Sequence, residues 1–203
     1  MKAIVAIALI AGTVLCTFAS AQEMSADDWL KEGFSLAANG SYEQSLEAYD
    51  KSIQIDPNNE LAWINKANIL LRLNRTDEAT GAYQKALDIT NQTLDADPKN
   101  ATLWAAKGML LHNVGDYRGA VWAFDNATSV DPSYEIAWKM NGVILASELG
   151  RDDEANGAFD RALAINPDDP ITWQAKGDVL KELGRQAEAD EAYAKARELG
   201  YED

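Results

Sequence analysis

The chain has 203 residues, a net charge of −15, one cysteine and one histidine. Its length suits one or two domains, and its acidity argues against nucleic acid and against anionic lipid held by a basic patch. Because Cys16 is the only cysteine, intrachain disulfides and thiolate metal sites are excluded.

Residues 1–21 have the features of a cleaved signal peptide. Lys2 precedes an apolar run from Ala3 to about Ala19, and small residues stand before Gln22. The expected location is therefore secreted or extracytoplasmic, in the periplasm or at the cell surface, with no membrane insertion after cleavage. The alternative is an uncleaved N-terminal membrane anchor, because the run is close to the shortest length that spans a bilayer. A lipid on Cys16 is disfavoured because the bulky Leu15 precedes it.

After the leader, tryptophan recurs at nearly fixed intervals, at Trp29, Trp63, Trp104, Trp138 and Trp173. Three other features recur with it. A small residue follows each tryptophan by four positions, at Gly33, Ala67, Gly108, Gly142 and Gly177. A turn-forming residue comes next, at Gly40, Asn74, Gly115, Gly150 and Gly184. An aromatic ring completes each series, at Tyr49, Tyr83, Phe124, Phe159 and Tyr193. Self-similarity at this period indicates stacked supersecondary units.

Each unit is predicted to be two amphipathic helices. In the first, Trp29, Gly33 and Leu36 share one helical face, a glycine ends that helix, and Asp56-Pro57 ends the second. Short connections make neighbouring helices antiparallel. We expect an all-α, right-handed solenoid of ten helices, forming one domain over residues 22–203. Its repeats are approximately 26–59, 60–100, 101–134, 135–169 and 170–203.

Two units depart from the common length. The second carries extra residues that keep the apolar stripe in phase through Tyr83, Leu87, Thr90 and Leu94. These residues predict a helix lengthened by two turns, from about Asp77 to Asp95, instead of a loop. The fourth has one extra residue near 147–149, at the end of its first helix.

The repeated residues resemble the tetratricopeptide repeat (TPR) family. The match consists of the tryptophan, the small residue after it, a leucine, a second small residue, the ring, an alanine and the closing proline, over about 26–201. The resemblance implies a right-handed superhelix whose first helices line a concave groove. It also implies that small residues allow close helix packing while the ring fills the space between units.

No pattern of catalytic residues is present. His112 has no second histidine or cysteine with which to share a metal, and the acidic clusters lack the alternating spacing of a calcium loop. Glycine-rich phosphate loops and nucleophile elbows are absent from the sequence. We expect a non-enzymatic protein with no cofactor and no metal.

The predicted groove lining is mainly apolar, with an amide in its middle. Apolar side chains that cannot be buried internally favour a partner-binding surface, although tight curling of the solenoid would bury several of them. The candidate binding residues are Leu30, Phe34, Leu61, Ile64, Asn68, Leu71, Met109, His112, Lys139 and Val143. Among them Asn68 is expected to bond a peptide backbone, and to matter little for folding.

Five Asn-x-Ser/Thr sequons are candidates for N-glycosylation, at Asn39, Asn74, Asn91, Asn100 and Asn126. They fall in turns, in a loop or on outward helix faces.

The leading functional hypothesis is an exported scaffold that binds a protein or peptide segment, with a basic partner favoured by the acidity. The main alternative is a structural subunit that self-associates head to tail into fibres or arrays. An enzyme or a glycan-binding module that uses an exposed Trp122 is a distant third.

Overall fold

The computed structural model describes residues 24–202, so the predicted leader and Cys16 lie outside the described residues. Over the described range the chain forms ten α-helices and no strand. The helices are α1 (Ala26–Ala38), α2 (Tyr42–Ile55), α3 (Glu60–Arg72), α4 (Thr76–Ala96), α5 (Ala101–Asn113), α6 (Tyr117–Val130), α7 (Glu135–Ser147), α8 (Asp152–Ile165), α9 (Pro170–Glu182) and α10 (Gln186–Glu198). They pair as five units, and the predicted all-α, right-handed solenoid is confirmed.

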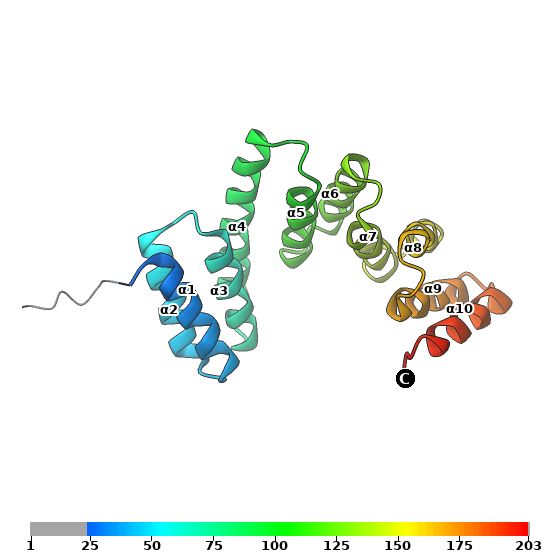
Figure 1. Ribbon diagram of the computed structural model, residues 1–203, viewed down its shortest axis with the longest axis horizontal. Coiled ribbons are helices and arrows are strands. Elements are labelled where there is room, and N and C mark those ends of the chain that lie inside the picture. The colour runs from blue at the N-terminus through cyan, green and yellow to red at the C-terminus, as the bar shows by residue number, and fades with distance from the viewer. Residues whose placement is uncertain (1–23, 203) are drawn as a thin grey trace, which may run out of the picture.

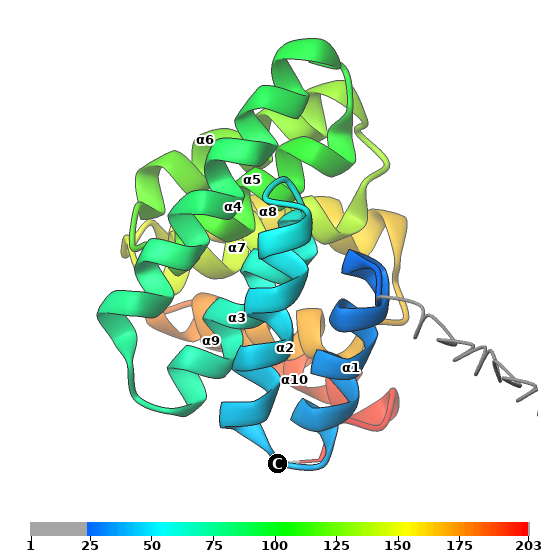
Figure 2. The ribbon, with the colours of Figure 1, turned by 90° about the vertical axis from the view of Figure 1, so that its left-hand side faces the viewer.

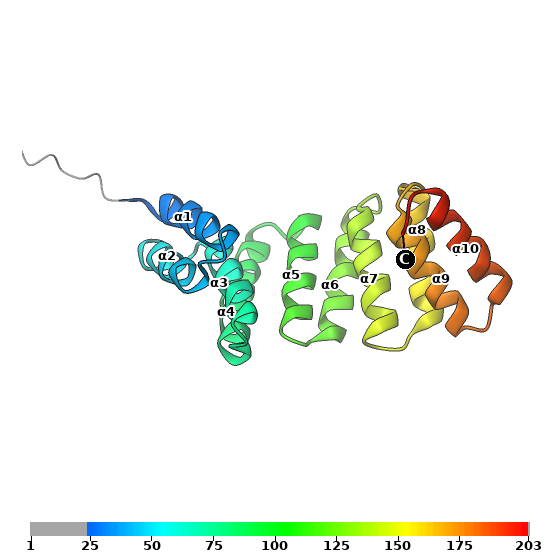
Figure 3. The same cartoon turned by 90° about the horizontal axis from the view of Figure 1, so that it is seen from below.

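The units follow one another in single file from α1 to α10, as seen from below in Figure 3. From the side the array forms an open arc with the two ends far apart (Figure 1). Viewed along the array, the helices of successive units point in different directions (Figure 2). Each helix packs mainly on the one before and the one after it, and α7 also touches α9. Stability in such an array depends on contacts within units and between neighbouring units.

A left-handed residue closes the first helix of every unit. Gly40 has a φ of 76°, and Asn74 at the same place has a φ of 59°; glycine and asparagine tolerate this region best. In the second unit the turn is closed by a hydrogen bond from Arg75 N to Leu70 O. In the fourth, Arg151 N reaches one residue further back, to Leu145 O, so the extra residue is absorbed in this turn.

The lengthened helix is also confirmed. Helix α4 has 21 residues, whereas α2, α6 and α8 have 14. The seven extra residues add about 10 Å of helix at about 1.5 Å per residue, and α4 extends well beyond α3 in Figure 1. Thr90 and Leu94 in the added part are buried, because the apolar stripe continues in register.

Within each unit the ring of the second helix lies directly against the small residue of the first. A Cβ built on Gly142 would stand 2.7 Å from Phe159, and one on Gly108 would stand 2.8 Å from Phe124. Both rings are at most 1% exposed. The small residue therefore sets how closely the two helices approach, and the ring fills the space that remains.

Between units, the tryptophan indole is bonded to the connecting loop. Trp63 Nε1 donates to Pro57 O at 2.9 Å, and Trp138 Nε1 donates to Pro132 O at 3.0 Å. Trp104 and Trp173 make the same bond to Pro98 and Pro167. In these four units the recurring tryptophan thus has a structural role, because its indole fixes the unit to the loop before it.

A polar residue stands three positions after each tryptophan, at Glu32, Lys66, Lys107, Asn141 and Lys176. From the sequence such side chains are expected to extend outward to water. Lys66 and Lys176 keep partial exposure and pair with Asp50 and Asp160 of the preceding unit. Asn141 corrects that expectation, because it is only 2% exposed and donates to Asp125 Oδ1. All three side chains link one unit to the next.

Gly142→Ala should destabilise the fold by about 1–3 kcal/mol, because the added methyl overlaps the Phe159 ring and forces the helices apart. Gly157→Ala on α8 is the matched control, since nothing lies within 4 Å of its Cβ position. The control should gain about 0.5–1 kcal/mol from the better helix propensity of alanine. Chemical denaturation of both variants measures the difference, and equal effects would contradict the packing assignment.

Candidate partner-binding groove

The first helices of the units present a row of exposed apolar side chains. Phe34 is 46% exposed, Leu61 57% and Ile171 62%. Leu71, Met109, Ile136 and Val143 are exposed as well. Seven of the twelve exposed large hydrophobic residues in the described chain belong to this row, which we call the groove row: Phe34, Leu61, Leu71, Met109, Ile136, Val143 and Ile171.

Other sequence-predicted groove residues are less available. Leu30 is 9% exposed and belongs to the hydrophobic core, so its expected place on an accessible surface is corrected. Its burial follows from packing by neighbouring helices, which a single-unit pattern does not reveal. Ile64 and His112 are partly buried, and His112 lies against the Tyr117 ring at 5.6 Å between centroids.

The residue directly after the small one touches the ring of its own unit. Asn68 Oδ1 accepts a hydrogen bond from the Tyr83 hydroxyl, and Asp178 Oδ1 accepts one from Tyr193 at 2.9 Å. Phe34 meets the Tyr49 ring edge-on at 6.0 Å. Asn68 is therefore bound on its carbonyl side but exposed, and within residues 24–202 its Nδ2 donates no hydrogen bond. The expectation that Asn68 matters little for folding is not supported. Tyr83 is buried, and its hydroxyl would lose its hydrogen-bond acceptor if Asn68 were replaced by alanine.

Lys139 is held in place by acids instead of being presented freely. Its Nζ lies 2.9 Å from Asp169 Oδ2, at the start of α9, and 3.5 Å from Glu135. Burial by itself would raise the pKa of Asp169, but hydrogen bonds from Thr172 and Lys139 outweigh it and leave that pKa below its usual value. This pair ties the fourth unit to the fifth beside the groove.

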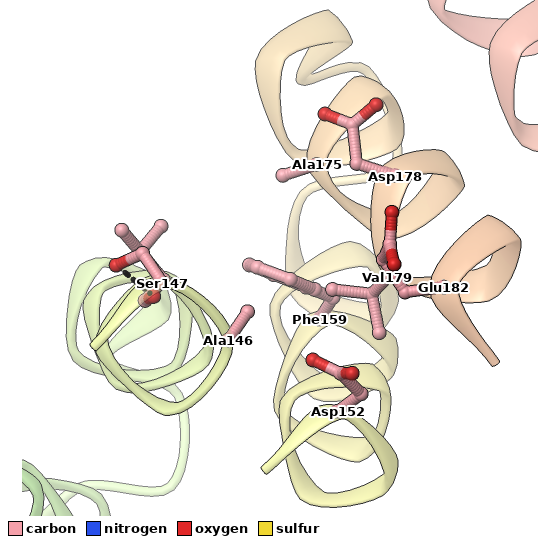
Figure 4. Close-up of a pocket in the computed structure, with 9 residues that line it drawn as sticks. Ala146, Ser147, Asp152, Phe159, Ala175, Asp178, Val179 and Glu182 are labelled. Atoms are coloured by element: carbon pink, nitrogen blue, oxygen red, sulfur yellow. Dashed lines mark hydrogen bonds between the residues drawn. The ribbon is translucent and has the colours of Figure 1, made fainter. Parts of the chain in front are cut away.

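The groove deepens between α7 and α9 into a cleft of about 290 Å³. Figure 4 shows Ala146 on α7 facing Phe159 and Ala175 across the gap, while the Ser147 hydroxyl donates back to Val143 O on α7. Carboxylates of Asp178 and Glu182 on α9, and of Asp152 on α8, lie around it. We call this the α7–α9 cleft, lined by Val143, Ala146, Ser147, Asp152, Phe159, Ala175, Asp178, Val179 and Glu182.

The rim of this cleft has a negative potential. The pKa of the Tyr193 hydroxyl is raised to about 12 by partial burial, by its hydrogen bond to Asp178 and by the charges of Asp178, Asp190 and Glu182. Of the cleft residues, the sequence places Val143, Ala146 and Asp178 on the groove side of their helices, and Val143 is among the candidate binding residues. Glu182 and Asp152 escaped the prediction because they belong to consecutive units and meet only when the units stack.

A second aromatic cluster lies on α5 and α6. Trp122 is 51% exposed and meets Trp104 edge-on at 5.1 Å, and Lys107 Nζ lies 5.2 Å from both rings. The equivalent surface of the fifth unit is a cleft lined by Trp173, Lys176 and Glu191, among others. Trp122 therefore covers a space on the third unit that is an open cleft on the fifth. A bound ligand is not required to explain its exposure.

The side-chain amides of the five sequon asparagines differ in exposure and in hydrogen bonding. Asn39 and Asn74 are exposed at the ends of α1 and α3, whereas Asn91 is partly buried on α4. Asn100 caps α5 and donates to Asp97, and Asn126 donates to Trp122 O. Asn39 and Asn74 are thus the most accessible acceptors.

No cluster of three or more His, Cys, Asp or Glu side chains is arranged to hold a metal ion within residues 24–202. None of the helices described here has both the length and the apolarity to cross a bilayer.

Asp169→Asn should lower the stability of the protein near neutral pH by about 1 kcal/mol, because asparagine keeps the helix cap but loses the attraction to Lys139. The lowered pKa of Asp169 means that its contribution is complete above the unfolded carboxyl pKa. It is then lost as the pH falls through the lower folded value. When the free energy of unfolding is measured by denaturation from neutral to acid pH, it should therefore fall less steeply for the variant than for the parent. Parallel curves of unfolding free energy against pH would contradict this role.

The fold and groove define a class of protein, an α-solenoid of repeated helix pairs with a concave face. Family models described as "Tetratricopeptide repeat" match residues 26–59, 48–80, 105–170 and 158–191. The chain belongs to the tetratricopeptide repeat family, as the sequence resemblance predicts.

Several solved structures share this fold. PilF from Pseudomonas aeruginosa is 20% identical, with a TM-score of 0.66 over 88% of this chain and 78% of that one. MamA from Desulfovibrio magneticus RS-1 is 18% identical, with a TM-score of 0.62 over 86% and 94%. YrrB, described as a TPR protein with an unusual peptide-binding site, is 21% identical, with a TM-score of 0.59 over 87% of both chains. No curated protein sequence matches the chain.

Proposed function

We propose that this protein is a non-enzymatic, exported scaffold that binds a segment of a protein partner along the groove row. The observation that carries the proposal is the row itself, in which large apolar side chains from all five first helices are exposed together. A monomeric solenoid gains nothing from leaving these side chains in water. Burial against a partner recovers about 25 cal/mol for each Å² of apolar surface that is covered.

The chemistry of the row suits a peptide. Apolar side chains accept those of a partner segment, while the Nδ2 hydrogens of Asn68 bond a backbone carbonyl. YrrB, whose reported peptide-binding site is formed on the same fold, supports the view that such a solenoid can hold a peptide.

The competing proposal is a structural subunit that assembles head to tail. The feature that favours it is the separation of the two unlike ends of the array in Figure 1, because a head-to-tail contact between unlike ends that does not close builds a filament. Sedimentation across a wide concentration range separates the two. A monomer at all concentrations supports the scaffold, and continued growth in size supports the subunit.

Asn68→Ala and Asn68→Asp form a discriminating pair for the groove. Both remove the Nδ2 donor, but the aspartate keeps the acceptor for Tyr83, as Asp178 does for Tyr193. Affinity for a captured partner should fall by about 1–3 kcal/mol in both variants, whereas Asn68→Ala alone should lose about 1 kcal/mol of folding stability.

Partners are captured from the proteins of the exported fraction and then measured by calorimetry against each purified variant. A Phe34→Ala, Asn68→Ala double variant that folds and yet retains every partner of the parent would overturn the proposal.

Export is proposed from the leader alone. Intact-mass measurement of the protein recovered outside the cytoplasm should give a chain that begins at Gln22, because the small residues before it fit a signal-peptidase site. A chain that still begins at Met1 and sediments with membranes would instead support the N-terminal anchor, and a lipid adduct on Cys16 would support a lipoprotein.

A further inference from the structure

We propose that the α7–α9 cleft selects the partner by binding a basic residue flanked by an apolar one, so that the scaffold takes cationic peptide segments in one register. This inference rests on the proposed function, and it assigns a chemistry to one part of the groove. The observations are the apolar floor of the cleft, the three carboxylates around it and the absence of cations that neutralise them.

The floor and the rim are suited to different parts of one ligand. Val143, Phe159 and Val179 provide an apolar surface, and the surrounding charged groups of the lining are all carboxylates. The side chains of lysine and arginine have the same division, with a hydrocarbon stem and a charged head. A cleft of about 290 Å³ holds one such side chain and an apolar neighbour.

The rim carboxylates differ from the other inter-unit acids in having no partner cation. Asp50, Asp160 and Asp169 each form an ion pair with a lysine. Within residues 24–202, no ion pair forms at Asp152, Asp178 or Glu182. The acids that hold the solenoid together are thus neutralised, whereas Asp152 and Glu182 at the cleft are available to a ligand. Asp178 also carries an unneutralised charge, although its Oδ1 accepts a hydrogen bond from Tyr193.

The position of Glu182 has no structural explanation. Asp152 opens α8, where a negative charge is favourable, but Glu182 is the last residue of α9, where the helix dipole favours cations. Its charge is therefore mildly unfavourable for the free protein. A bound lysine or arginine would offset this cost, which makes Glu182 the residue whose replacement separates binding from folding.

The test selects binders from a display library of random short peptides with the purified chain lacking residues 1–21. Peptides that pair a basic with an apolar residue should be enriched. The affinity of a synthetic enriched peptide should fall about threefold for Glu182→Gln and about tenfold for Glu182→Lys, and it should weaken with added salt. Glu182→Gln should fold at least as stably as the parent.

Glu191→Gln and Glu191→Lys are matched controls, because Glu191 is an exposed acid in the same unit that lines a different cleft. They should leave peptide affinity unchanged. If enriched peptides are neutral or acidic, or if Glu182 and Glu191 variants act alike, the basic-residue site is refuted while groove binding stands. If no peptide is enriched and the Phe34 and Asn68 variants keep all partners, the proposed function fails as well.

Discussion

The close approach of the two helices in each unit is the constraint on which the rest of the structure depends. Gly108 and Gly142 allow the Phe124 and Phe159 rings to lie where a Cβ would otherwise be. In the second unit the corresponding small residue is Ala67, and both it and Tyr83 are buried. Because the distance between the helices is fixed by these contacts, every unit has nearly the same shape, and identical shapes stack into a regular array.

The same constraint affects the residues that line the groove. The residue that follows each small residue stands beside the ring of its unit, so the ring influences which side chain is suitable there. Where the ring is Tyr83 or Tyr193, the neighbour is an amide or a carboxylate whose oxygen accepts a hydrogen bond from the tyrosine hydroxyl. In the fourth unit Val143 lies with Phe159, which has no hydroxyl, in the lining of one cleft. The first unit differs, because Tyr49 has the apolar Phe34 as its neighbour. The groove is therefore partly a consequence of core packing, and in the second and fifth units its polar residues are the acceptors of a core tyrosine.

Charge has two separate roles in this acidic chain. Acids such as Asp160 and Asp169 join neighbouring units through lysine, and the strength of that link follows the ionisation of the carboxylate. The carboxylates of the α7–α9 cleft are left unpaired in the described chain and face an opening with an apolar floor. The first group of acids stabilises the stack of units, and the second is available for recognition. The net charge of the chain does not distinguish the two groups.

The sequence by itself determined the fold, because tryptophan, small residue, ring and proline recur in a register that only stacked helix pairs satisfy. It also determined the length of α4, since the apolar stripe keeps its phase through Thr90 and Leu94. Only the tertiary structure decided the burial of Leu30, the bond between Asn68 and Tyr83, and the meeting of Asp152 with Glu182. These features arise between helices or between units. Their geometry depends on the angle and spacing of packed neighbours, which the periodicity of a single helix does not contain.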